Sequence, residues 1–174
     1  AKAGARVLAL DSSADAVTAL DAAAPTRNTL RGLYEALAPE YGLGTADRRF
    51  WSAAVDDSLA WFAEFDAERR GEGRIALAEG AGALTLPEFD PPFTLTAKAD
   101  RIDILNDGEA AIYDYKLSRV PSEKQIKHFS PQLSLIGAII EAGGFGAIGA
   151  RRVASYAYCR LTNRKDKESE NTLA

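Results

Sequence analysis

Cysteine, histidine and methionine are almost missing from this chain. Its 174 residues include one cysteine, one histidine and no methionine. The lone Cys159 excludes a disulfide framework within the chain, and the lone His128 leaves neither a Ser–His–Asp triad nor a set of zinc ligands. No apolar run approaches the roughly 18 residues that a membrane helix needs, and no signal peptide opens the sequence. These absences predict a soluble protein of the cytoplasm.

A nucleotide-binding loop of the Gly-x-x-x-x-Gly-Lys-Ser/Thr type is also lacking, so no ATP-driven motor is expected. One domain accounts for the length and for the 47% of hydrophobic residues. Because the first residue is not methionine and the start carries no structural signal, we expect the chain to be a piece of a longer polypeptide. Within it we expect a helical part over 1–70, a core over 74–161 and a flexible tail over 162–174.

Positive charge is scarce in the first half of the chain and concentrated in the second. Residues 1–90 carry nine Lys/Arg against fifteen Asp/Glu, whereas residues 116–165 carry nine against two. The formal net charge of −4 argues against a general nucleic-acid binder, but the second half could attract a phosphate backbone. The candidate DNA-binding side chains there are Arg119, Lys124, Lys127, Arg151 and Arg152. Solvated helix and strand faces explain the same charges equally well.

Two alternating segments, 94–105 and 110–116, flank a turn at Asn106-Asp107-Gly108. This pattern predicts a β-hairpin, because glycine accepts the positive φ that tight hairpin turns require. The hairpin can bring Asp100 together with Asp114 and Lys116, and the last two share one face of their strand. Two carboxylates and a lysine on one sheet face suit a metal-dependent phosphodiesterase. The carboxylates would hold Mg²⁺ or Mn²⁺, and the ammonium would stabilise the negative charge of the transition state.

Hydrophobic spacing predicts the elements around this hairpin. Helices are expected over 29–38 with Asn28 as cap, 45–70, 123–128 and 131–141, and further strands over 6–10, 74–79, 83–86 and 153–161. Aromatic residues of the long helix, Trp51 and Phe62 among them, recur at helical spacing, so we expect them in the core and not as platforms for nucleic-acid bases. The element order predicts an α/β fold, a central mixed β-sheet flanked by helices.

The motif Asp100…Asp114-Tyr115-Lys116 resembles the signature of the PD-(D/E)XK nuclease superfamily, and its wording is similar to the RecB-like branch. Gln132-Leu133-Ser134-Leu135 sits where that branch carries Gln-Leu-x-Leu-Tyr. Residues 61–80 are similar to the segment before the nuclease core in AddB, the nuclease-bearing subunit of AddAB helicase–nucleases. This resemblance implies a restriction-endonuclease-like core and an Mg²⁺- or Mn²⁺-dependent exonuclease. It also implies that single-stranded DNA, supplied by a helicase subunit resembling AddA, is cut during double-strand break repair.

The resemblance also implies roles for individual residues. Asp100, Asp114 and the backbone carbonyl of Tyr115 would ligate the metal, and Lys116 would orient or activate the attacking water. Glu79 matches an acidic position near the metal, although ordinary surface charge is as good an explanation. Gln132 would orient the nucleophile or the DNA backbone. Asp103 is expected to be structural, paired with Arg101 or Arg119.

The chain departs from the family pattern at three points. The family tyrosine four residues after Gln132 is replaced by Ile136. Related nucleases often have a metal-binding histidine before the motif, whereas the only histidine of this chain, His128, comes after it. With Cys159 alone, the four-cysteine iron–sulfur cluster of many AddB proteins is not expected in this chain. Two readings therefore stay open. One is an active nuclease domain, and the other is an inactive nuclease-like module that binds DNA or braces a helicase partner.

Overall fold

The computed structural model describes residues 24–116, 131–161 and 170–173. They form two compact units. The helical unit contains residues 24–72 together with 115–116 and 160–161, and the sheet unit contains residues 73–114, 131–159 and 170–173. Among the described helices, none is long and apolar enough to cross a membrane.

The helical unit begins with α3 (Arg27–Leu37), followed by the short 3-10 helix η1 (Ala38–Tyr41). The cap of α3 is Thr26, whose hydroxyl accepts a hydrogen bond from the Thr29 backbone N–H at 3.2 Å, so the prediction of Asn28 as cap was wrong by two residues. Threonine supplies the side-chain oxygen that an N-cap requires. Pro39 and Gly42 end this region as expected, with Gly42 at a φ of 75°.

The expected single helix over 45–70 is two helices, α4 (Thr45–Phe50) and α5 (Ser52–Glu72). The break lies at Trp51, whose φ of −89° and ψ of 0° depart from helical values. The break shifts the helical period, so residues before it do not share the buried face of α5. Phe62 and Phe65 are buried as predicted, but Trp51 is 54% exposed, which corrects its assignment to the core, and Phe50 before it is 78% exposed.

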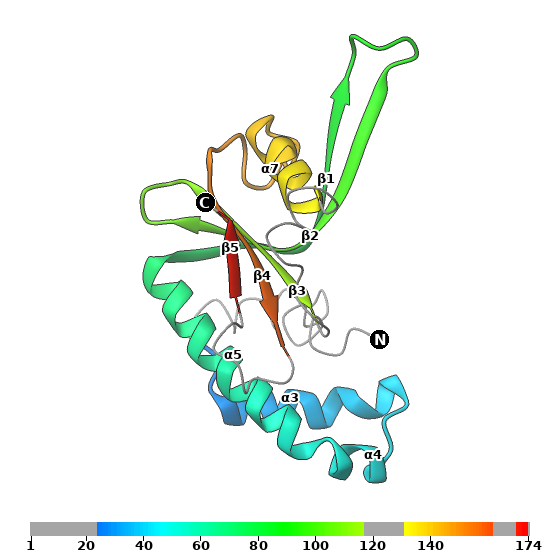
Figure 1. Ribbon diagram of the computed structural model, residues 1–174, viewed down its shortest axis with the longest axis vertical. Helices are drawn as coiled ribbons and strands as arrows, with labels where there is room; N and C mark the ends of the chain where they lie inside the picture. The colour runs from blue at the N-terminus through cyan, green and yellow to red at the C-terminus, as the bar shows by residue number, and fades with distance from the viewer. Residues whose placement is uncertain (1–23, 117–130, 162–169, 174) are drawn as a thin grey trace. The chain divides into compact units, whose positions relative to one another are not determined.

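A five-stranded sheet has the order β1 (Gly73–Leu86), β2 (Phe93–Leu105), β3 (Ala110–Lys116), β4 (Val153–Arg160) and β5 (Glu170–Leu173) (Figure 1). The pairs β1–β2, β2–β3 and β4–β5 are antiparallel. Hydrogen bonds join the starts of β3 and β4, Ala110 N–H to Arg152 O, and their ends, Leu161 N–H to Lys116 O. Strands β3 and β4 are therefore parallel, and the predicted mixed sheet is confirmed.

The predicted hairpin between β2 and β3 is present. Gly108 has a φ of 88°, and its backbone N–H donates to the Leu105 carbonyl at 2.9 Å. The Asp107 carboxylate accepts from the Glu109 N–H at 2.9 Å. Glycine is favoured at such a φ because it has no Cβ to clash with the backbone, so the turn sequence itself fixes the register of the two strands.

Strand β1 is one continuous strand where two were predicted on either side of Gly80 and Gly82. Close packing explains both glycines. A Cβ on Gly80 would lie 2.3 Å from Leu77 Cγ, and one on Gly82 would lie 2.6 Å from the Phe145 ring. These glycines thus mark close approaches inside a strand and not its ends.

Helix α7 (Gln132–Glu141) packs against β1 and β2, and the outer part of the β1–β2 hairpin extends past it (Figure 1). The buried side of α7 joins apolar residues of the strands in one core. The members of that core are Ala99, Ile102, Ile104, Ala110, Ile112, Leu133, Ile136, Ile139, Ile140, Phe145, Ile148 and Tyr158. The prediction of a helix over 131–141 is confirmed, with Pro131 as its N-cap.

The expected tail over 162–174 is wrong for its last part, because Glu170–Leu173 form β5 against β4. Pairing supplies hydrogen-bond partners to a strand edge that would otherwise be open, which composition alone does not reveal. Two predicted elements, the strand over 6–10 and the helix over 123–128, lie outside the described residues, as does His128.

Candidate active site

Two carboxylates meet on neighbouring strands of the sheet unit. The β2–β3 register pairs Arg101 with Tyr113 and Ile102 with Ile112. Continued by one residue, it sets Asp100 opposite Asp114. Side chains directly opposite each other in an antiparallel pair lie on the same face with Cβ atoms about 5 Å apart. The register therefore brings together the two aspartates that the sequence singled out.

Asp114 is the more deeply placed of the two, with 4% of its surface exposed. Its Oδ1 accepts a hydrogen bond from Gln132 Nε2 at 3.2 Å. Gln132 is the first residue of α7, so the helix that packs on β1 and β2 delivers this amide to the end of β3. The hydrogen bond fixes the Asp114 carboxylate and links two sequence motifs that are 18 residues apart.

A hollow of about 540 Å³ lies between β2 and the beginning of α7. Lys98 and Gln132 line it together with Thr96 and the apolar side chains of Leu135 and Ile136. Because Gln132 also contacts Asp114, the hollow adjoins the carboxylate pair. Lys98 and Gln132 thus place a cation and an amide in a mostly apolar hollow next to the carboxylates.

Glu79 belongs to the same neighbourhood. The β1–β2 register pairs Ala78 with Arg101 and Gly80 with Ala99, which sets Glu79 opposite Asp100. Its carboxylate forms an ion pair with Lys98 at 2.5 Å, and its φ of 51° is a backbone value that non-glycine residues rarely adopt. Such strain is found most often at functional sites. Glu79, Asp100 and Asp114 thus follow one another across β1, β2 and β3.

Asp114, Tyr115 and Lys116 are the last three residues of β3. Alternation along the strand places the Lys116 side chain on the same face as Asp114 and the Tyr115 ring on the other. Within the helical unit the Tyr115 ring packs against Phe62 and Phe65 of α5, with ring centroids 5.9 and 6.4 Å apart. The Tyr115 ring therefore belongs to the core of the helical unit, and its backbone carbonyl directly follows Asp114 in the chain.

The donor set can be compared with what a metal requires. Within the described residues, no group of three or more His, Cys, Asp or Glu side chains is close enough to hold a metal ion. Mg²⁺, however, is commonly held by one or two carboxylates while it keeps several waters. Asp100, Asp114 and the Tyr115 carbonyl fit that requirement, whereas zinc, which needs nitrogen or sulfur ligands in a closed set, does not fit.

Arg101 and Asp103 lie on the other face of β2 from Asp100. Each is 1% exposed, and the guanidinium donates two hydrogen bonds to the carboxylate, Nε to Oδ1 at 2.7 Å and Nη2 to Oδ2 at 2.6 Å. The prediction that Asp103 is structural and pairs with Arg101 is confirmed. Because Asp103 lies on the opposite face of β2 from Asp100, it does not join Asp100 and Asp114 as a third carboxylate.

Two of the five predicted DNA-binding residues are described. Arg151 donates to the carbonyls of Ile148 and Gly108, and Arg152, 79% exposed, pairs with Glu109 at 3.0 Å. Both lie at the start of β4 beside Ala110, about 13 Å along β3 from Asp114 at the usual strand rise. Arg119, Lys124 and Lys127 lie outside the described residues.

Ile136, at the position of the family tyrosine, is 2% exposed and part of the core. Tyr156 of β4 lies against α7, and its hydroxyl would lie 2.6 Å from a Cβ on Gly137. Burial, and to a lesser extent the negative charge of Glu141, raises the pKa of Tyr156, so its hydroxyl keeps its proton at neutral pH. Gly137 is more than one helical turn beyond Gln132, so Tyr156 does not replace the missing hydroxyl beside Asp114.

Sequence reasoning missed one residue of this site. Lys98 is not among the residues that the sequence singled out, but it pairs with Glu79 and lines the hollow. The available signal was its position two residues before Asp100 on the same strand, which places both side chains on one face.

Known proteins resemble this chain over most of its length. The PD-(D/E)XK nuclease superfamily matches residues 6–174. An uncharacterized protein of Rickettsia conorii is 29% identical over 114 residues, which are 65% of this chain and 13% of that protein. An uncharacterized protein of Rickettsia bellii is 31% identical over 104 residues, 59% of this chain and 12% of that protein. This chain therefore spans only a small part of the length of these relatives. Members of the matching superfamily are generally nucleases, and the mixed sheet with its aspartate-bearing hairpin agrees with that fold. The chain belongs to the PD-(D/E)XK nuclease superfamily.

Proposed function

We propose that this chain is an Mg²⁺- or Mn²⁺-dependent deoxyribonuclease domain that hydrolyses phosphodiester bonds of single-stranded DNA. The observation that supports it most strongly is the placement of Asp114. This carboxylate is buried, lies opposite Asp100 by continuation of the strand register, and is oriented by Gln132. A buried carboxylate with a carboxylate neighbour favours binding of a divalent cation, because the cation offsets the repulsion between them.

The reaction assigns a separate task to each residue. A bound divalent ion would lower the pKa of a water molecule and neutralise charge on the phosphate. Asp100, Asp114 and the Tyr115 carbonyl would hold that ion, and Gln132 keeps Asp114 in position. Lys116 orients the attacking water and stabilises the added negative charge as the oxygen of water bonds to phosphorus and one P–O ester bond breaks. Glu79, whose backbone is strained, is the residue that would bind a further water molecule near the metal.

The first experiment replaces Asp114 by asparagine and Lys116 by alanine. Asp114→Asn is expected to abolish both Mn²⁺ binding, measured by isothermal titration, and cleavage of a single-stranded oligonucleotide. Lys116→Ala is expected to keep Mn²⁺ binding and to lose about 10² to 10³ in cleavage rate, because the ammonium acts on the transition state and not on the metal. Glu88→Gln, an exposed carboxylate at the tip of the β1–β2 hairpin, serves as the control.

Equal Mn²⁺ binding by the wild type and Asp114→Asn would move the metal site elsewhere. If the wild type binds single-stranded DNA but does not cut it with Mg²⁺ or Mn²⁺, the alternative of an inactive module that binds DNA or braces a partner replaces the enzyme. The burial of Ile136 at the position of the family tyrosine is the observation that favours this alternative.

From the likeness of its motifs to AddB, we further propose that this activity serves double-strand break repair, as an exonuclease acting on a strand delivered by a helicase subunit resembling AddA. The substrate preference tests this placement. The chain is expected to cut a single strand faster than the same sequence in a blunt duplex, and to shorten the strand from an end. Equal rates on both substrates would mean that the chain needs no unwound strand, and would contradict a role downstream of a helicase.

A further inference from the structure

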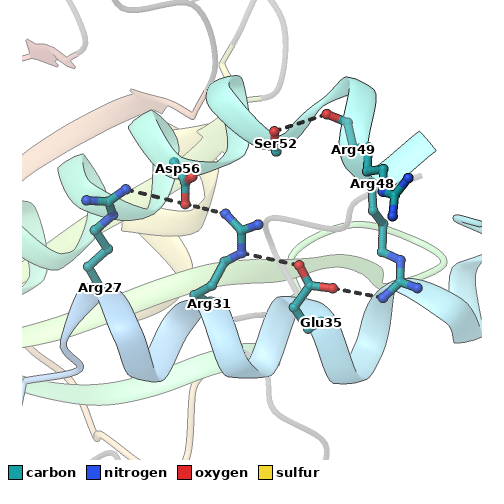
Figure 2. Close-up of polar contacts among 7 residues, drawn as sticks. All are labelled: Arg27, Arg31, Glu35, Arg48, Arg49, Ser52 and Asp56. Atoms are coloured by element: carbon teal, nitrogen blue, oxygen red, sulfur yellow. Dashed lines mark hydrogen bonds and ion pairs between the residues drawn. The ribbon is translucent and has the colours of Figure 1, made fainter. Parts of the chain in front are cut away.

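Outside the candidate active site, the helical unit carries a group of arginines on α3 and α4. Arg27, Arg31 and Arg48 reach two carboxylates, Asp56 and Glu35 (Figure 2). Arg48 donates to Glu35 at 2.8 Å, and Arg31 donates to Glu35 at 3.2 Å and to Asp56. These ion pairs hold α3 against α5 and leave more positive than negative charge in the group.

A hollow of about 410 Å³ opens beside this group. Its lining holds three arginines and one carboxylate, with two hydroxyls, and consists of Arg31, Glu35, Thr45, Arg48, Arg49 and Ser52. The Arg49 guanidinium makes no ion pair with any described residue, and the buried Arg48 Nε–H has no acceptor among them. Asp47, on the same short helix, is used in accepting the Gly44 N–H. An anion with several acceptor oxygens would satisfy these donors.

Two aromatic side chains follow Arg49 directly. Phe50 is 78% exposed and Trp51 is 54% exposed, and their rings meet edge to face with centroids 4.9 Å apart. Exposed aromatic rings of this size are unfavourable in water unless they meet a partner. The break in the helix at Trp51 is what turns both rings out of the core.

We propose that this surface, Arg31, Thr45, Arg48, Arg49, Phe50 and Trp51, binds single-stranded nucleic acid. A backbone phosphate would lie in the hollow against Arg48 and Arg49, and a neighbouring base would stack on the exposed face of Trp51 or Phe50. Positive charge beside flat aromatic rings is the combination that binds single strands without sequence preference. A duplex keeps its bases stacked on one another and offers only the phosphates. The proposal rests on the proposed function, in which a single strand is the substrate, and adds a second contact surface for it.

Binding can be measured without cleavage. A labelled oligo(dT) strand is titrated with the intact chain in EDTA, and its fluorescence anisotropy is recorded. Replacing Phe50 and Trp51 together by alanine is expected to weaken binding by about 5- to 150-fold, the range for losing one stacked base. Arg49→Gln is expected to weaken binding and to lower the salt slope by about 0.7, the value for one lost phosphate contact.

Matched controls lie in the sheet unit. Arg74→Gln and Phe89→Ala remove an exposed arginine and a 54% exposed phenylalanine, and both are expected to leave the affinity unchanged. A direct signal comes from Trp51 itself. The chain has two tryptophans, so in Trp61→Phe the emission of Trp51 alone is observed, and oligo(dT) is expected to quench it.

The outcomes separate this proposal from the nuclease. Quenching that persists in Asp114→Asn, which cannot cut, supports the binding surface whether or not the wild type is an enzyme. Cleavage without quenching, full affinity in the Phe50 and Trp51 variant, equal loss in the controls, or equal quenching by a duplex would each overturn it.

Discussion

One arginine–carboxylate pair of the sheet unit and one of the helical unit differ in how deeply they are buried. In the sheet unit, Arg101 and Asp103 are both 1% exposed and are joined by two short hydrogen bonds. In the helical unit, Arg31 and Asp56 form a similar contact with about a third of each side chain exposed, 33% and 31%. If Arg101 or Asp103 loses its partner, water cannot take that partner's place, because both side chains are buried. At Arg31 and Asp56, water can take the place of a lost partner. The same chemical pair is therefore structural at Arg101–Asp103 and exchangeable at Arg31–Asp56.

This difference bears on where ligands can bind. Asp100 and Asp114 need a rigid sheet to hold them opposite each other, and the Arg101–Asp103 pair lies on the same strand as Asp100 and fixes its other face. Exposed guanidiniums on α3 and α4 can instead change partners, from a carboxylate to a phosphate, at little cost. Buried charge thus supports the candidate catalytic carboxylates, and exposed charge supports the proposed strand-binding surface.

The largest expected effect on stability comes from breaking the buried pair. Asp103→Ala is expected to lower the free energy of unfolding by about 3–5 kcal/mol, because it leaves the Arg101 charge in the interior without its bidentate acceptor. That is a large part of the roughly 5–15 kcal/mol that stabilises a typical domain. Urea denaturation followed by circular dichroism measures it.

The control for this prediction is the exposed pair of the same unit. Glu109→Ala removes the partner of Arg152, which is 79% exposed, and is expected to cost less than about 1 kcal/mol. Similar losses in the two variants would mean that the Arg101–Asp103 pair is more hydrated than its exposed fraction indicates, and the contrast between buried and exposed pairs would fail.

Parts of this architecture that depend on neighbouring residues were predictable. The sequence Asn106-Asp107-Gly108 predicts a hairpin turn, and this turn fixes the β2–β3 register. The position of Asp100 opposite Asp114 could therefore be predicted from the sequence. Helix α7 followed from its apolar spacing. In both cases the residues that determine the structure are within a few positions of one another.

Features set by distant contacts were not predictable. The break at Trp51 depends on one residue leaving helical geometry within a sequence that continues the apolar pattern. The partner of Glu79, Lys98, follows from the alignment of β1 on β2, which no local signal states. The arginine group of the helical unit was hidden by summing charge over residues 1–90, because ion pairs and folding select which charges share a surface.

Packing density offers a second, smaller contrast between the units. A Cβ on Gly144 would lie 2.1 Å from the Ala83 carbonyl oxygen and 2.6 Å from Ile139 Cγ2, whereas a Cβ on Gly32 in α3 would meet nothing within 4 Å. Gly144→Ala is expected to lower the free energy of unfolding by about 1–3 kcal/mol through overpacking. Gly32→Ala is expected to raise it by about 1 kcal/mol, because alanine favours the helix. Thermal denaturation of both variants gives the two signs, and a loss of stability in Gly32→Ala would contradict the open packing of α3.

The smallest expected effect concerns pH and the exposed pair. The hydrogen bond from Arg31 lowers the pKa of Asp56, against a smaller opposing effect of burial. Because the pKa of this carboxyl is lower in the folded than in the unfolded chain, its contribution is complete above about pH 4 and is lost as the pH falls through the lowered value. Asp56→Asn is expected to cost a few tenths to about 1 kcal/mol at pH 7. Urea denaturation of this variant and the wild type at pH 7 and in steps below pH 4 should show that the difference in their free energies of unfolding shrinks.

Glu40→Gln, which changes an exposed carboxylate of η1 with no ion pair among the described residues, should show no such convergence. A cost for Asp56→Asn that stays constant down to the acid transition would mean that Asp56 acts through packing and not through its charge, and would make the ion pairs of the helical unit as structural as the buried pair of the sheet.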